Sequence, residues 1–261
     1  MRLAYEELGE QGAPVLVCLH GVTGHGLHFA RLGERLRERF HVVAFDLRGH
    51  GNSSFEPPWS IEQHVEDALD TLTEVGLVDA PIRWLGHSFG GRIAFEVAAA
   101  APEAVERLVL LDPAILIPAH VAVSAAENAR ADRSYASLDE AVDRRFEESV
   151  LSRAPRELVE AELRQHLVQR PDGRWRYRYL QSAVVAAYGE MSREPPPFEL
   201  VRVPTLLLLG EDSYLPYDHL LDAHAAALGD ELEVVRVPGG HTVLWDAPEE
   251  TAEAVEAFLG R

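Results

Sequence analysis

The sequence has no lysine and a single cysteine, and it has no apolar run long enough to cross a membrane. The lone Cys18 cannot form an intrachain disulfide, and its position in the run VLVCLH predicts a buried core residue without a redox role. The first ten residues lack the basic start and apolar stretch of a secretion signal. We therefore expect a soluble, cytoplasmic protein.

Positive charge is also scarce. The 24 basic residues, all arginine, face 43 acidic residues, which gives a formal net charge of −19. An acidic surface repels phosphate backbones and anionic lipid headgroups, so neither nucleic acid nor a membrane is an expected partner. A strongly anionic substrate is disfavoured for the same reason. The hydrophobic fraction of 47% is that of an ordinary globular protein.

Short, continuous apolar runs alternate along the chain with segments of helical periodicity. Continuous apolar runs are typical of strands buried on both faces, and their alternation with helices predicts a doubly wound, mostly parallel α/β sheet. Residues 2–8 are expected to add an antiparallel edge strand. The predicted strands are 15–19, 42–45, 82–85, 108–111, 205–209 and 232–237. The predicted helices are 27–39, 61–76, 89–101, 217–228 and 248–259.

Residues 118–197 break this alternation, because they contain helical patterns and no good strand before the run Pro195-Pro196-Pro197. We expect residues 1–117 and 198–261 to form the core and residues 118–197 to form an inserted helical cap. Such a cap would roof the substrate pocket. Its aromatic side chains Trp175, Tyr177 and Tyr179 are expected to pack within the cap rather than line the pocket.

The most specific motif is Gly86-His87-Ser88-Phe89-Gly90, which matches G-x-S-x-G between a predicted strand and a predicted helix. That context is the one in which a serine sits on a strained turn with its hydroxyl exposed. The helix N-terminus that follows offers free N–H groups to a developing anion. Ser88 is therefore the predicted nucleophile.

A serine nucleophile needs an imidazole base and a carboxylate that orients the base. His241 follows the predicted strand 232–237 and the pair Gly239-Gly240, at the sheet edge where α/β active sites gather. Asp212 and Asp112 each follow a strand, and the chain order Ser, Asp, His fits both. Asp212 is the first choice and Asp112 the reserve.

Two backbone N–H groups are expected to bind the oxyanion that forms when an ester carbonyl is attacked. One belongs to Phe89, the residue after the nucleophile. The second is expected in the loop 20–24, where Val22 is the best candidate.

With these motifs the sequence resembles the α/β-hydrolase fold superfamily, in its small-esterase, perhydrolase and enol-lactonase branch. The matching segments are HGVTG (20–24), FDLRGHGNS (45–53), GHSFGG (86–91), GEDSYLP (210–216) and GGHTV (239–243). The resemblance implies a serine hydrolase with no metal and no organic cofactor. It departs from many relatives at the acid, where the usual G-x-x-D is one residue shorter, with Asp212 only two residues after Gly210.

We expect a serine esterase that cleaves a small-molecule carboxylic ester. The same triad could instead serve carbon–carbon bond hydrolysis, lactone opening, perhydrolysis or acyl transfer. A non-catalytic binding protein that kept the fold is a second alternative, and a structural scaffold is a third. The sequence predicts neither the substrate's identity nor the oligomeric state.

Overall fold

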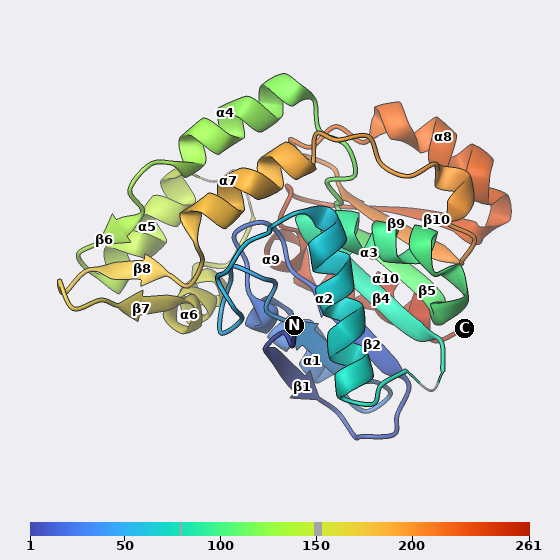
Figure 1. The fold of residues 1–261 in the computed structure, drawn as a ribbon. Helices are drawn as coiled ribbons and strands as arrows, with labels where there is room; N and C mark the ends of the chain where they lie inside the picture. The colour runs from blue at the N-terminus through green and yellow to red at the C-terminus, as the bar shows by residue number, and fades with distance from the viewer. Residues whose placement is uncertain (79, 149–152) are drawn as a thin grey trace.

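The computed structural model describes residues 1–78, 80–148 and 153–261, and a seven-stranded sheet forms its centre (Figure 1). The strand order is β1-β3-β2-β4-β5-β9-β10, and within this sheet only the β1–β3 pair is antiparallel. This confirms the predicted fold class and the antiparallel edge strand. The strands are β1 (Tyr5–Leu8), β2 (Val15–Leu19), β3 (His41–Phe45), β4 (Ile82–His87), β5 (Val105–Leu111), β9 (Thr205–Gly210) and β10 (Leu232–Val237).

Helices cover both faces of the sheet, because its strands are apolar on both sides. Along β2, Val17 and Leu19 belong to one hydrophobic core, whereas Leu16 and Cys18 belong to the core on the opposite face. Cys18 is buried, as predicted. Helices α2 (Ile61–Glu74), α3 (Phe89–Ala100) and α8 (Asp218–Leu228) pack on the first face, and α1 (Ala30–Leu36) and α10 (Pro248–Leu259) pack on the second.

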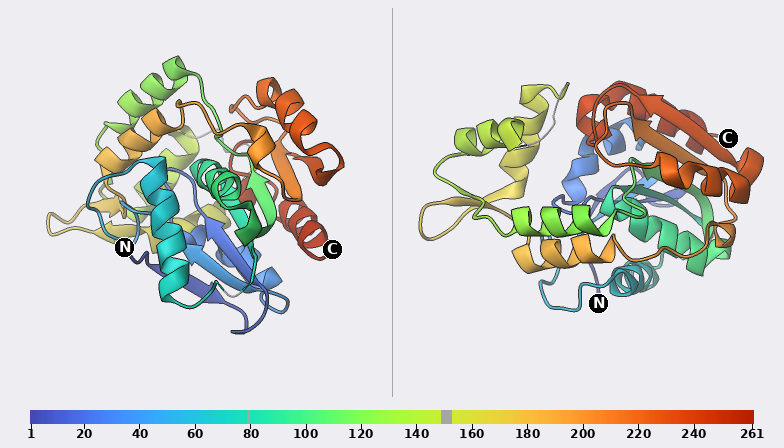
Figure 2. Two further views of the ribbon diagram at one scale, coloured as in Figure 1. Left: turned by 45° about the vertical axis from the view of Figure 1, so that its right-hand side comes forward. Right: turned by 90° about the horizontal axis from the view of Figure 1, so that it is seen from above.

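The cap segment, defined here as residues 118–197, lies to one side of the sheet (Figure 2). Residues 149–152 of this segment lie outside the described residues. Its helices are α4 (Ala119–Ala129), α5 (Leu138–Glu148), α6 (Arg156–His166) and α7 (Gln181–Glu190). Part of the segment has its own small core, in which Leu163 and Leu167 pack with Trp245 from the core domain.

The prediction that the cap segment lacks strands is wrong. It holds a three-stranded sheet of order β6-β8-β7, with β6 (Ser134–Tyr135), β7 (Leu167–Gln169) and β8 (Trp175–Tyr177). Strands of two or three residues are too short to show the alternation by which strands are recognised. The turn between β7 and β8 contains Gly173 at a φ of +80°, a conformation that favours glycine.

Two helical details also differ from the prediction. The expected helix 27–39 is a 3₁₀ turn, η1 (Gly26–Phe29), followed by α1, and a short helix α9 (Val243–Asp246) was not predicted. The remaining 3₁₀ turns are η2 (Pro102–Ala104), η3 (Phe198–Leu200) and η4 (Gly229–Glu231). In the described part of the chain, no helix combines the length and the apolar character needed to span a bilayer.

Candidate active site

Ser88 occupies the sharp turn between β4 and α3. Its backbone has φ 55° and ψ −118°, a strained conformation for a residue with a side chain. The flanking glycines make this turn possible. A Cβ on Gly86 would lie 2.2 Å from the carbonyl oxygen of Gly90, and a Cβ on Gly90 would lie 2.1 Å from that of Leu19. Backbone packing thus requires both glycines of the motif.

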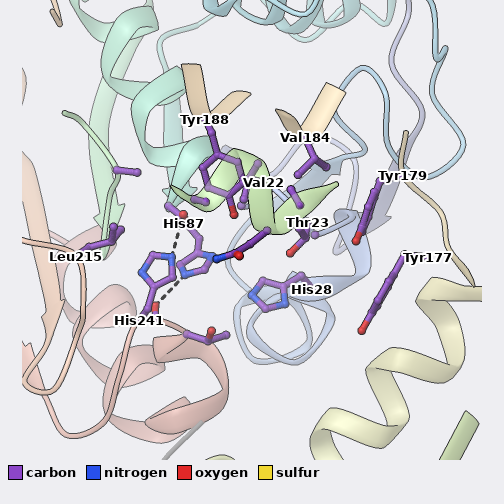
Figure 3. Close-up of a pocket in the computed structure, with 18 of the residues that line it drawn as sticks. Val22, Thr23, His28, His87, Tyr177, Tyr179, Val184, Tyr188, Leu215 and His241 are labelled. Atoms are coloured by element: carbon purple, nitrogen blue, oxygen red, sulfur yellow. Dashed lines mark hydrogen bonds between the residues drawn. The ribbon is translucent and has the colours of Figure 1, made fainter. Parts of the chain in front are cut away.

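His241 reaches Ser88 from the loop that follows β10. Its Nε2 lies 2.9 Å from Ser88 Oγ, within hydrogen-bonding distance. Two hydrogen bonds fix the loop: Gly240 N–H donates to Asp246 Oδ2 over 2.9 Å, and His87 Nε2 donates to the His241 carbonyl over 3.0 Å. Figure 3 shows His87 and His241 side by side at this point. Burial, together with the nearby His241, holds the pKa of His87 well below its usual range, so His87 remains a neutral donor.

The carboxylate beside His241 belongs to Asp112, which lies directly after β5. Asp112 Oδ2 is 2.6 Å from His241 Nδ1 and also accepts a 2.5 Å hydrogen bond from Ser213 Oγ. Its Oδ1 accepts a hydrogen bond of 3.0 Å from Gly210 N–H. A carboxylate at Nδ1 favours the imidazole tautomer whose Nε2 is free to accept the Ser88 proton.

The first choice, Asp212, is therefore corrected in favour of the reserve, Asp112. The Asp212 side chain is exposed, and its backbone N–H donates to the Gly239 carbonyl over 2.9 Å. Strand order explains the difference. Asp112 follows β5, which is next to the strand that ends at Ser88, whereas Asp212 follows β9, one strand further away. Both aspartates follow strands in the sequence, and the sequence does not contain the order of those strands.

The two residues predicted as oxyanion donors, Val22 and Phe89, follow the neighbouring strands β2 and β4. Phe89 is the first residue of α3, a position whose N–H has no partner inside the helix. Val22 is in the turn closed by the 2.9 Å hydrogen bond from Gly24 N–H to the Gly21 carbonyl. That carbonyl also lies 2.8 Å from His20 Nδ1. Because a trans peptide directs its N–H opposite to its C=O, the Val22 N–H points away from both groups.

A cavity of about 360 Å³ opens beside Ser88 and His241. The core and the cap segment both contribute side chains to its walls. Figure 3 shows His28 from the core, and Tyr177, Tyr179 and Tyr188 from the cap segment. Trp175 and Tyr177 pack against the small core of the cap, as expected, whereas Tyr177 and Tyr179 also line the cavity, which was not expected.

A buried polar cluster joins the core to the cap on one side of the cavity. Glu162 of α6 lies 2.7 Å from His28 Nδ1 through Oε1, and its Oε2 accepts a hydrogen bond from Trp245 Nε1. His166 stacks on His25 with ring centroids 4.2 Å apart. Burial lowers the pKa of His25 to about 4, so its ring is neutral at neutral pH. Sequence reasoning did not identify Glu162 or His166 because their helix was not placed against the core.

The motif FDLRGHGNS has a structural role. Asp46 accepts hydrogen bonds from the N–H groups of Gly26 and Asn52, each over 2.8 Å. Arg48 forms a buried two-pronged ion pair with Asp67, with Nε–Oδ2 and Nη2–Oδ1 distances of 2.6 and 2.7 Å. In the described ranges, no three His, Cys, Asp or Glu side chains are placed to hold a metal ion together.

Comparison with known proteins agrees with this geometry. The sequence profile of the alpha/beta hydrolase fold matches residues 14–248. The chain belongs to this family. Lipase LipV of Mycobacterium tuberculosis is 33% identical over 262 residues, which cover 99% of this chain and 98% of the lipase. A 2-(acetamidomethylene)succinate hydrolase of Mesorhizobium japonicum is 31% identical over 258 residues, 96% of this chain and 90% of that enzyme.

Solved structures show the same fold. The crystal structure of E-2-(acetamidomethylene)succinate hydrolase superposes with a TM-score of 0.88 at 22% identity, covering 99% of this chain and 95% of the other. The enol-lactonase from Burkholderia xenovorans superposes with a TM-score of 0.78 at 20% identity, covering 99% of this chain and 96% of the lactonase. This α/β-hydrolase chain is accordingly a hydrolase, as the resemblance implied.

Proposed function

We propose that this α/β hydrolase cleaves carboxylic esters through an acyl-enzyme on Ser88. The observation that carries the proposal is the continuous series of contacts from Asp112 through His241 to Ser88. In this arrangement the base touches the nucleophile and the carboxylate orients the base, which are the two requirements for activating a serine hydroxyl. The name of the lipase relative supports esters as the substrate class.

In the first half-reaction, His241 Nε2 takes the proton of Ser88 as Oγ bonds to the ester carbonyl carbon. The carbonyl oxygen becomes an anion, which the N–H groups of Val22 and Phe89 stabilise. When the tetrahedral intermediate collapses, the bond to the alcohol oxygen breaks and His241 returns its proton to that oxygen. The alcohol leaves, and the acyl group stays on Ser88.

In the second half-reaction, water takes the place of the alcohol. His241 removes a proton from water as the hydroxyl bonds to the acyl carbon, and then returns the proton to Ser88 Oγ as the acid leaves. Asp112 remains ionised and stabilises the imidazolium in both halves. We propose that the cap segment roofs the acyl-binding part of the cavity, because its side chains line that space with those of the core.

The proposal is tested with 4-nitrophenyl esters of short fatty acids. Ser88→Ala should lower kcat/KM by about 10⁴-fold or more, because it removes the atom that forms the covalent bond. Ser124→Ala is the matched control, since Ser124 is exposed on α4 far from the motif in sequence. Activity retained in full by Ser88→Ala would overturn the proposal. Product analysis in the same assay separates hydrolysis from perhydrolysis and acyl transfer.

A further inference from the structure

The cavity beside Ser88 contains a cationic side chain that the catalytic scheme does not use. Arg145 of α5 lines this cavity together with Ser88 and His241. Its guanidinium carbon lies 5.1 Å from the ring centroid of Trp245, which lines the same space. Stacking on an aromatic ring occupies the face of the guanidinium plane and leaves the N–H groups at its edge free to bind a ligand.

Arg145 has no acidic partner among the side chains that the structure describes. Its Nε is buried without a hydrogen-bond partner, which is costly for a charged donor. Glu162 lines the same cavity, but its two carboxylate oxygens accept hydrogen bonds from His28 and Trp245. By contrast, the buried Arg48 is fully paired with Asp67. Arg133 also lines this cavity but already has an interaction partner, whereas Arg145 is available to an anionic group from outside the chain.

Hydroxyl donors lie on the same cavity. Tyr177 and Tyr179 stack at 5.4 Å, and neither hydroxyl has a hydrogen-bond partner in the described ranges. Figure 3 shows both side chains directed toward the cavity. Burial raises the pKa of Tyr179, so that its hydroxyl remains protonated and able to donate.

We propose that the esters cleaved here carry a second, free carboxylate, which binds the guanidinium of Arg145 with help from the tyrosine hydroxyls. This inference rests on the proposed function, because it assigns the far end of the substrate whose carbonyl Ser88 attacks. The formal net charge of −19 does not oppose it. Charges separated by more than about 8 Å are largely screened at physiological ionic strength, whereas a direct contact inside a cavity is screened much less.

The test compares pairs of esters that differ only at the far end. One member is the 4-nitrophenyl monoester of adipic, pimelic or suberic acid with its second carboxylate free, and the other carries that carboxylate as a methyl ester. These chains are too long for rapid self-cleavage by the free carboxylate. The wild-type protein should prefer the free acid, mainly through a lower KM, for at least one chain length.

In Arg145→Gln, the ratio of kcat/KM between free acid and methyl ester should fall by about 10- to 100-fold, the range expected for a lost charged hydrogen bond. Arg144→Gln is the matched control, because Arg144 is exposed on the same helix and its replacement changes net charge equally. Its ratio should stay at the wild-type value. Tyr179→Phe, which removes a single hydroxyl, should lower the ratio by a smaller factor.

The outcomes separate this inference from the proposed function. If the wild-type protein hydrolyses both members of every pair and prefers the methyl esters, the carboxylate subsite is wrong and the esterase stands. The subsite is equally wrong if Arg145→Gln and Arg144→Gln change the ratio alike. If the wild-type protein cleaves neither member and Ser88→Ala matches it, the proposed function itself fails. If Arg145→Gln does not fold, two results still test the subsite: the preference of the wild-type protein for the free acid, and the lower ratio expected in Tyr179→Phe.

Discussion

Replacing Asp112 with asparagine tests the geometry of the active site at a buried carboxylate. Asp112 is only 2% exposed. Its oxygens accept from three donors: His241 Nδ1 at 2.6 Å, Ser213 Oγ at 2.5 Å and Gly210 N–H at 3.0 Å. An asparagine must place its NH₂ group where one of its two oxygens now accepts. A donor then faces a donor, either at Gly210 or at His241.

If the amide nitrogen faces His241, the imidazole adopts the other tautomer and its Nε2 can no longer accept the Ser88 proton. The same exchange in serine proteases lowers kcat by about 10⁴-fold, which corresponds to about 5 kcal/mol of lost transition-state stabilisation. We expect a loss of that order for Asp112→Asn. The steady-state rate on a 4-nitrophenyl ester measures it, and circular dichroism checks that the variant is folded.

Asp212→Asn is the matched control, because it makes the same chemical change at an exposed carboxylate after the neighbouring strand. Its kcat should stay within about twofold of the wild-type value. A large loss in Asp212→Asn together with a small loss in Asp112→Asn would refute the reasoning, since it would restore the acid favoured by the sequence.

Two further predictions concern the scaffold. Gly90→Ala should cost about 1 to 3 kcal/mol of unfolding free energy and most of the activity, because its Cβ would lie 2.1 Å from the Leu19 carbonyl oxygen. Gly189 lies on α7, and a new methyl group there would have nothing within 4 Å. Gly189→Ala should therefore stabilise the protein by up to about 1 kcal/mol, measured by urea unfolding. Equal changes in unfolding free energy for the two variants would contradict this explanation. Burial lowers the pKa of His64 to about 3, so stability should be complete above about pH 6.5 and fall by about 1.4 kcal/mol per pH unit below it for each such histidine. Urea unfolding between pH 7 and pH 5 measures this, and an unchanged midpoint would show that the ring is not buried in its neutral form.

The sequence predicts the features that depend on local pattern. Strands such as β2 and β9 are continuous apolar runs, because both of their faces are buried. Ser88 could be identified because the motif, the strand before it and the helix after it all lie within a few residues of one another. His241 was identifiable for a related reason, since a glycine pair and a strand end precede it directly.

The features that the sequence does not predict depend on which distant segments meet. Choosing between Asp112 and Asp212 requires the strand order β4-β5-β9, and that order depends on tertiary packing. The side chains that complete the cavity wall, such as Glu162 and Arg145, come from cap helices whose position against the core is not visible in their own sequence. From the sequence alone, polar residues such as these are predicted to lie on an exposed helix surface. The structure instead places them beside Trp245 of the core.

The most direct test of the central claim is the mass of the protein after reaction with a fluorophosphonate, followed by peptide mapping. We expect one adduct, on Ser88, and no adduct in Ser88→Ala. Labelling of His241→Gln should be much slower, because the base that activates the hydroxyl is then absent. An unlabelled wild-type protein, or an adduct on another residue at an undiminished rate in Ser88→Ala, would contradict it.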